Sequence, residues 1–249
     1  MSGHSKWATI KRKKAATDQA RGKLFSKVIK EITIAARHGG GDPEGNPRLR
    51  SAIAAAKAIN MPSNNVERAI KRGTGEIEGA HYEETQYEGY APGGVALLVE
   101  IATDNKNRTA GEIRHIFTRF GGNLGEAGSV AYLFKPRGVI LVEKKVVGED
   151  TLMEIVLDAG ADDVNTEGET YEVLTPPAAL EAVKEALAKR KIATQSAELT
   201  RVATLQVPVA AKDVQSLLNL VDALEDHDDV QKVHANFNVP DEILAKLAR

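Results

Sequence analysis

The amino-acid sequence predicts an α+β protein: an N-terminal three-helix domain followed by two ferredoxin-like βαββαβ domains, one inserted in the other. Three observations support this class. Apolar residues recur at three- and four-residue steps over the first 80 positions, as in amphipathic helices. After residue 80, short apolar runs alternate with helical patterns. The order of these elements is β-α-β, then β-α-β-β-α-β, then β-α-β, so the two outer halves can combine.

The domain boundaries follow from these changes of pattern. We predict a basic helical domain over residues 1–79, a discontinuous α/β domain over 80–134 plus 201–249, and an inserted βαββαβ domain over 135–200. One continuous mixed sheet is the alternative. Insertion is preferred because each outer half alone would leave a two-stranded sheet, which is marginal in water.

The helices of the first domain are set by their start and stop signals. A Gly-Gly-Gly-Asp-Pro run after residue 38 ends the long helix. Asn46-Pro47 begins the next one, since proline suits the first turn. Ser63 or Asn64 is expected to cap the third, with Glu67 placed for a capping box with Asn64, and Gly73 is expected to close it. The expected helices span residues 11–16, 21–37, 47–60 and 66–72.

The strands after residue 80 are apolar runs of four to nine residues. Residues 82–90 predict an edge strand, and VALLVEIA at 95–102 predicts a fully buried one. Further strands are expected over 129–134, 139–143, 163–167, 171–174, 194–199, 204–209 and 230–237. Helices between them are expected over 107–120, 151–159, 176–189 and 212–225.

Positive charge is concentrated at the beginning of the chain, although the net charge of the whole is only −2. Residues 1–80 contain 16 Lys and Arg against 7 Asp and Glu, whereas residues 81–249 contain 17 against 28. This asymmetry predicts an anionic partner for the basic part. A polyanion would repel the acidic remainder, so we expect one end of the molecule to make the contact.

The most basic stretch is residues 6–30, which carry nine Lys or Arg and one acid, Asp18. On the long helix the cations fall opposite the apolar stripe. A solvated face is the ordinary interpretation, but the mixed charges of an ordinary surface are missing. Because Lys and Arg neutralise phosphates, we predict a nucleic-acid-binding surface. Its residues are Lys6, Trp7, Lys11, Arg12, Lys13, Lys14, Arg21, Lys23, Lys27, Lys30 and Arg37.

A second polar cluster, residues 104–109, follows the predicted buried strand. Ligands often lie beyond strand ends at a helix N-terminus, so an anion or partner contact is one interpretation. A plain helix cap by Asn107 or Thr109 is the other. The candidate contact residues are Asn105, Lys106, Asn107, Arg108 and Thr109.

The motifs of catalytic and metal sites are missing from the sequence. The three glycines at 39–41 lack the Lys-Ser/Thr of a phosphate loop, and no HExxH or GxSxG occurs. His227-Asp228-Asp229 could suggest a metal site, but polar turns are expected between a helix and a strand. We therefore predict no catalytic residue, no metal and no cofactor.

The composition bounds the compartment. The chain has no cysteine, which excludes disulfides and thiolate chemistry and is compatible with a reducing cytoplasm. No apolar run reaches the roughly 18 residues of a membrane span. The basic N-terminus lacks the apolar segment of a signal peptide. We predict a cytoplasmic protein without a membrane partner.

Several long segments carry a resemblance to a known family and occur in its order along essentially the whole chain. They are GHSKWATIKRKKAATDQARGKLFSK, GGGDPEGNPRLR, NMPSNNVERAIKRGTGE, YEGYAPGGVALLVE, TDNKNRT and GGNLGEAGSVAYLF. The sequence resembles the YebC/PmpR family, with Arg12 where many relatives have His. The resemblance implies a cytoplasmic, three-domain, non-enzymatic protein. It also implies DNA-binding transcriptional regulation, although the similar mitochondrial translational activator of cytochrome oxidase acts on translation.

Three functions follow as alternatives. The first is a DNA-binding transcriptional regulator acting through the basic domain. The second is a translation factor on ribosomal RNA or the ribosome, with the acidic domains facing ribosomal proteins. The third is a small-ligand sensor with a pocket between the paired βαββαβ units. The turn after the long helix is too long for a helix-turn-helix, and Trp7 either stacks on a base or packs the N-terminal arm. A monomer is the favoured oligomeric state.

Overall fold

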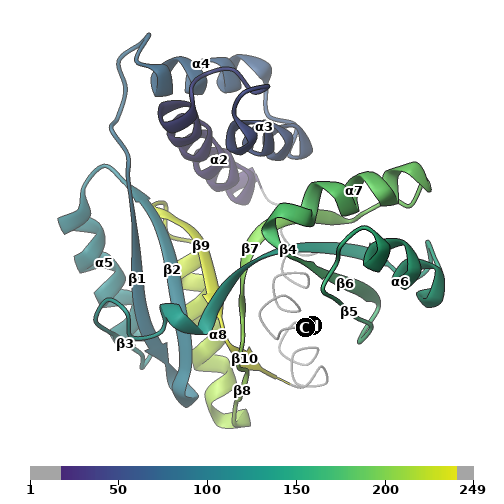
Figure 1. Cartoon of the computed structure of the whole chain (residues 1–249). Helices are drawn as coiled ribbons and strands as arrows, with labels where there is room; N and C mark the ends of the chain where they lie inside the picture. Colours follow the sequence, from purple (N-terminus) through teal and green to yellow (C-terminus); the bar gives the residue numbers. More distant parts are fainter. Residues whose placement is uncertain (1–17, 240–249) are drawn as a thin grey trace.

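A computed structural model describes residues 18–239, with helices at the N-terminal end and antiparallel four-stranded sheets after them (Figure 1). The predicted α+β class is therefore confirmed. The predicted N-terminal arm and short helix lie outside the described residues. The same holds for six predicted contact residues, Lys6, Trp7, Lys11, Arg12, Lys13 and Lys14.

Three helices form the first part of the described chain, and we call them the helical part. They are α2 (Asp18–Gly39), α3 (Pro47–Ala58) and α4 (Ser63–Thr74). Their shared core joins Ile32 and Ala36 of α2 to Leu49 of α3 and Ala69 of α4. The predicted apolar stripe of the long helix is confirmed, since it buries against the other two helices.

Asn46 joins the end of α2 to the start of α3. Its side-chain oxygen accepts a hydrogen bond from the Leu49 N–H at 3.0 Å, which caps α3. Its amide nitrogen donates to the carbonyl oxygens of Ala35 and Gly40 at 2.8 and 2.9 Å. Helix ends leave backbone groups without partners. One buried side chain therefore serves both ends, and the predicted start at Asn46-Pro47 is confirmed.

The start and end of α4 differ from the prediction. Pro62 precedes the helix and no side chain caps it, so the predicted capping box of Asn64 and Glu67 is wrong. Gly73 does not close the helix but is buried inside it. A Cβ atom there would lie 2.4 Å from the Thr33 carbonyl oxygen, because α4 packs closely on α2. The helix ends at Gly75, whose φ of 82° favours glycine.

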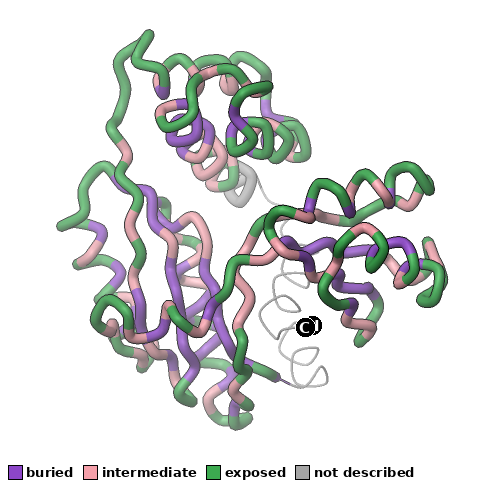
Figure 2. Tube along the Cα trace, viewed as in Figure 1, coloured by how far each residue is buried: buried purple, intermediate pink, exposed green. Residues whose placement is uncertain are grey.

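The first sheet follows the helical part and has the strand order β3-β1-β2-β9. Its strands are β1 (Glu83–Ala91), β2 (Val95–Thr103), β3 (Asn123–Leu124) and β9 (Val230–Ala235). Helices α5 (Lys106–Arg119) and α8 (Ala211–Glu225) pack on one face and share its largest core. Strand β2 is buried along nearly its whole length, as predicted for VALLVEIA (Figure 2).

The strand predicted over residues 129–134 does not form in this sheet. Ala131–Leu133 is a short 3-10 helix, η2, and the chain then enters the next sheet. The reason is Glu88, a buried carboxylate on β1. It accepts the N–H groups of Gly128, Val130 and Ala131, each at 2.7 Å. Because these N–H groups donate to the Glu88 side chain, they are not available for hydrogen bonds with a neighbouring strand.

Strand β1 lies between β3 and β2, so its predicted edge position is wrong. In space, β1 occupies the position that the third strand has in a ferredoxin-like sheet. In the chain, however, β1 comes before β2 and is joined to it by the 3-10 turn η1 (Pro92–Gly94). The strand predicted over 204–209 is reduced to β8 (Val207–Pro208). It pairs in parallel with β10 (Phe237–Asn238), outside the first sheet.

The second sheet has the order β5-β6-β4-β7, which is the ferredoxin-like order for a βαββαβ unit. Its core lies between the strands and the two helices. The elements in chain order are β4 (Phe134–Glu143), α6 (Glu149–Asp158), β5 (Asp163–Asn165), β6 (Thr170–Thr175), η3 (Pro177–Ala179), α7 (Leu180–Lys189) and β7 (Ser196–Ala203).

The second sheet lies between β3 and β8 in the sequence, and β9 returns to pair with β2. The division into domains at 1–79, 80–134 with 201–249, and 135–200 remains our proposal. Within residues 18–239, each helix is too short or too polar to cross a lipid bilayer.

Candidate functional site at the junction of the helical part and the first sheet

The helical part meets the first sheet through helix α2, whose face opposite the apolar stripe is turned toward the loop between α8 and β9 (Figure 1). We call this contact the junction. Lys23, Lys27 and Lys30 of α2 reach residues 225–229, which are the end of α8 and the start of that loop. A basic helix face therefore lies against an acidic turn.

Lys30 is the most enclosed cation of the junction, with a residue exposure of 9%. Its ammonium group lies 2.7 Å from Asp229 Oδ1 and donates to the Asp228 carbonyl oxygen at 2.9 Å. The Ala102 carbonyl oxygen, at 3.3 Å, is its third acceptor. All three ammonium donors are therefore satisfied, as burial of a charged group requires.

Asp229 is the centre of the junction and is itself buried. Its Oδ2 accepts from Arg108 at 2.6 Å, from Thr109 at 2.7 Å and from Thr103 at 3.1 Å. Burial alone would raise the pKa of this carboxyl. The hydrogen bonds from Lys30, Arg108 and Thr109 outweigh burial and hold the pKa well below its usual range. Asp229 therefore remains an anion that binds α2 and α5 together.

Further polar contacts surround this centre. Lys27 donates to the Glu225 carbonyl oxygen at 2.5 Å, and Lys23 lies 3.6 Å from Asp226. Arg37, near the other end of α2, donates to the Tyr82 carbonyl oxygen at 3.0 Å. Arg48 of α3 forms a bidentate ion pair with Glu84 of β1. The junction thus has many polar contacts, but it is not wholly polar: the Tyr82 ring lies under the Lys30 ammonium group, and Ile34, on the same face of α2, is 1% exposed.

The predicted contact residues of α2 are distributed differently from the expectation. Lys23, Lys27, Lys30 and Arg37 lie opposite the apolar stripe as predicted, but Lys30 is buried there and not exposed. The other three also contact the first sheet or its loops. Arg21 lies on α2, but its side chain is outside the described set. Their role in nucleic-acid binding stays a prediction.

The polar cluster after β2, residues 104–109, contains the N-terminal cap of α5. The Asn105 side chain accepts from the Arg108 N–H at 3.1 Å and caps α5, so the cap is Asn105 and not Asn107 or Thr109. Thr109 is buried against Asp229, and Lys106 pairs with Glu83 on β1. Asn107 is exposed. An anion or partner contact at these residues stays a prediction.

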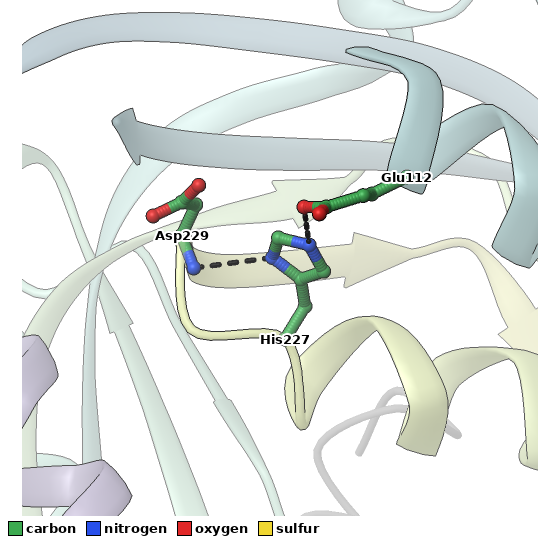
Figure 3. Close-up of side chains that lie close together, drawn as sticks. All are labelled: Glu112, His227 and Asp229. Atoms are coloured by element: carbon green, nitrogen blue, oxygen red, sulfur yellow. Dashed lines mark hydrogen bonds and ion pairs between the residues drawn. The ribbon is translucent and has the colours of Figure 1, made fainter. Parts of the chain in front are cut away.

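His227 lies beside two carboxylates, as Figure 3 shows. Its Nε2 is 2.9 Å from Glu112 Oε2, and its Nδ1 accepts the Asp229 N–H at 3.1 Å. The potential ligand atoms of Glu112, His227 and Asp229 lie within 4.8 Å of one another. Both ring nitrogens and both Asp229 oxygens already have protein partners. We therefore interpret this group as a hydrogen-bonded turn.

A cleft of about 1070 Å³ opens beside the junction. Arg72, His115 and Glu112 line it together with Lys23 and Lys30 of α2. No sequence pattern singles out Arg72 and His115, which come from separate helices. Asp229 is visible in the sequence only as part of a polar turn. A signal that could have been used is the pairing of basic residues 6–30 with the acidic run at 226–229.

The cations that are exposed in the helical part lie on α3 and α4. Arg50 and Lys57 are exposed on α3, and Arg68 and Lys71 are exposed on α4. Arg50 also donates to the carbonyl oxygens of Pro43 and Glu44. These four side chains are open to a polyanion while the lysines of α2 are engaged with the first sheet.

Fold and junction together define a class of protein in which an acidic α+β body carries a small basic helical part. Family models match both: "TACO1/YebC protein N-terminal domain" matches residues 5–76, and "TACO1/YebC second and third domain" matches residues 82–237. The chain belongs to the TACO1/YebC family, and the resemblance seen in the sequence is confirmed.

Relatives extend over the full length. A protein of Syntrophobacter fumaroxidans named "Probable transcriptional regulatory protein" is 59% identical over 249 residues and covers 100% of both chains. One of Desulfatibacillum aliphaticivorans with the same name is 57% identical and covers 99% of this chain and 100% of the relative. A solved structure, "Conserved Hypothetical Protein Aq1575 from Aquifex Aeolicus", is similar with a TM-score of 0.82 and 50% identity. It covers 91% of this chain and 94% of that chain.

Proposed function

We propose that this protein is a non-enzymatic, nucleic-acid-binding regulator of gene expression in the cytoplasm, and that duplex DNA is its first target. The observation that carries the proposal is the charge asymmetry of the chain. Residues 1–80 hold 16 Lys and Arg against 7 acids, whereas the remainder is acidic. The name shared by its curated relatives, probable transcriptional regulatory protein, supports the same direction.

The contact surface in this proposal is the helical part. Arg50, Lys57, Arg68 and Lys71 supply exposed positive charge on α3 and α4. Each cation that meets a phosphate releases counterions, which gives affinity without reading a sequence. The acidic body is repelled by the same polyanion, so the helical part approaches first.

Base reading requires side chains aimed at base edges from an element that enters a groove. The seven residues between α2 and α3 make a connection longer than the 3–4-residue turn of a helix-turn-helix. We therefore propose a surface that follows the phosphate backbone, with selectivity coming from the shape of the nucleic acid.

A four-residue variant tests the surface. Changing Arg50, Lys57, Arg68 and Lys71 to Gln should abolish most binding to duplex DNA at near-physiological salt. If four phosphates are contacted, log affinity of the natural protein should fall with log salt at a slope of about −3.6, and the variant should flatten it. The matched control changes four exposed cations of the body to Gln: Lys135, Lys189, Arg190 and Lys212. Equal loss in both variants would contradict the proposal.

Ribosomal RNA is the second candidate target, and the acidic body favours it. A net negative surface suits the basic proteins that accompany ribosomal RNA better than it suits naked duplex DNA. Competition between purified ribosomes and excess genomic duplex DNA separates the two targets. Retention on ribosomes would make the DNA affinity generic polyanion attraction. Selection of particular duplexes would establish the transcriptional role.

A further inference from the structure

We propose that the junction is an autoinhibitory latch, in which the loop between α8 and β9 covers the basic face of α2 until a phosphate backbone displaces it. The latch consists of Lys23, Lys27 and Lys30 on one side and residues 225–229 on the other. This inference rests on the proposed nucleic-acid binding, since it assigns a regulation to that surface.

The three lysines form one row along α2. Their spacing of four and three residues places them on the same side of the helix over two turns. Each of them meets an oxygen of the same loop or of the last turn of α8. A row of cations satisfied by a row of oxygens is the arrangement that a phosphate backbone would also offer.

The covering segment is negative for two reasons. It is the C-terminal end of α8, where unpaired carbonyl groups carry partial negative charge. It also carries four consecutive residues, Asp226, His227, Asp228 and Asp229, of which three are acids. The carbonyl oxygens of Glu225 and Asp228 and the carboxylates of Asp226 and Asp229 all take part. The loop thus presents to α2 the acceptors that it would find on a nucleic acid.

The latch can release because the hydrophobic cores on its two sides are separate among the described residues, and polar contacts surround Ile34, a buried apolar side chain on the lysine face. The core of the helical part draws only on residues 25–70, and the core of the first sheet only on residues 87–239. The covalent connection is the irregular segment between α4 and β1. Ion pairs and hydrogen bonds are exchanged with water or phosphate at little net cost, and exposed ones are screened by salt.

Opening would change the charge that a nucleic acid meets. In the latched state the row of lysines is paired with the loop, and the exposed Lys and Arg side chains that the structure describes in the helical part lie on α3 and α4. In the open state the three lysines of α2 are also accessible to phosphates, and the acidic body is farther from the nucleic acid. A duplex bound at α3 and α4 therefore favours release of α2, because the open state offers it three more lysines and binds it more tightly.

A pair of charge-reversal variants tests the latch. Asp226→Lys/Asp228→Lys repels the α2 row, and both aspartates are exposed, so the fold is kept. The control, Glu154→Lys/Asp158→Lys, makes the same change of net charge at exposed positions of α6. We expect the first variant to bind a 30-base-pair duplex at low salt on the order of tenfold tighter than the control.

The outcomes separate the latch from the function. Binding by the first variant alone, or much tighter binding by it, supports the latch. Equal binding by the natural protein and both variants keeps the proposed function and overturns the latch. Binding by none of the three overturns both.

A second measurement follows the movement itself. The chain has no cysteine, so dyes can be attached at Ala54→Cys on α3 and Ser216→Cys on α8, both exposed positions. Energy transfer between them should fall when the duplex is added to the otherwise natural protein. Saturating binding of the duplex without a change in transfer would overturn the latch.

Discussion

The helical part and the second sheet are both attached to the first sheet, but through contacts of different chemistry. Between the sheets, Leu98 of β2 packs with Phe134, Val130 and Ala203 in a small apolar cluster. At the other attachment, Lys30 and its neighbours meet carbonyls and carboxylates. Apolar burial has no competitor in water, whereas a polar contact competes with water, salt and phosphate.

This difference assigns different tasks to the two attachments. The joint between the sheets fixes two ferredoxin-like units into one acidic body. It also carries an ion pair, since Glu100 of β2 lies 3.2 Å from Arg201 of β7. The junction, by contrast, is held by polar contacts beside the buried Ile34, which belongs to no apolar cluster of the described residues. Loss of an apolar contact and loss of a polar contact should therefore weaken the molecule by different amounts.

Removing the Phe134 ring should have the largest effect. Because the Phe134 side chain is only 2% exposed, Phe134→Ala should create a cavity in the apolar cluster between the sheets. We expect the free energy of unfolding, measured with urea, to fall by about 3–5 kcal/mol. Tyr132→Ala, two residues away and 66% exposed, is the control and should cost less than about 1 kcal/mol. An equal cost for both would mean that the cluster does not hold the sheets.

Acid should weaken the joint between the sheets through Glu100. Burial alone would raise the pKa of Glu100, but the hydrogen bonds and charges of His234, Lys232 and Arg201 outweigh burial and lower the pKa to about 2. A lowered pKa contributes stability above the unfolded value of about 4.3, which is lost as pH falls toward 2. For each tenfold decrease in the proton affinity of the carboxylate on folding, the free energy of unfolding at neutral pH is larger by about 1.4 kcal/mol.

Glu100→Gln isolates this contribution. Urea unfolding between pH 7 and pH 3 should show that the variant loses less stability on acidification than the natural protein. Glu154→Gln, at an exposed position of α6, should follow the natural protein. Parallel curves for all three proteins would show that the contacts of Glu100 do not stabilise the folded state.

The two attachments also differ in how far the sequence predicted them. The apolar stripe of α2 and the buried strand β2 are local patterns, and both were predicted. The second sheet follows from the order of its elements in one continuous segment. Two-residue strands such as β3 and β8 have no periodicity, so β3 was not predicted and the strand predicted around β8 was too long.

The junction was missed for a different physical reason. A helix pattern shows which face is polar but not what lies opposite that face. Lys30 looks like a surface lysine in its own segment, yet its partner Asp229 comes 199 residues later. The charge asymmetry of the chain predicts an external polyanion for its positive half. The structure shows that part of it is already matched within the chain.

Removing the buried cation of the junction should have an intermediate effect. Lys30→Met keeps the length of the side chain but leaves the Asp229 carboxylate with Arg108 and the two threonines. A hydrogen bond to a charged group contributes about 1.5–3 kcal/mol, so the free energy of unfolding should fall by that amount. Lys57→Met on α3 is the exposed control and should change it by less than about 0.5 kcal/mol. Equal effects would indicate that Lys30 is solvated.

The exposed ion pair between Arg48 and Glu84 should have the smallest effect and should reveal the polar character of the junction. The two side chains are 40% and 45% exposed. A double-mutant cycle with Arg48→Gln and Glu84→Gln should give a coupling of about 0.2–1 kcal/mol at low salt. Raising the salt to about 1 M, where the screening length is about 3 Å, should remove most of it. A coupling that persists at high salt would mean that the junction excludes water and that the helical part is as firmly attached as the second sheet.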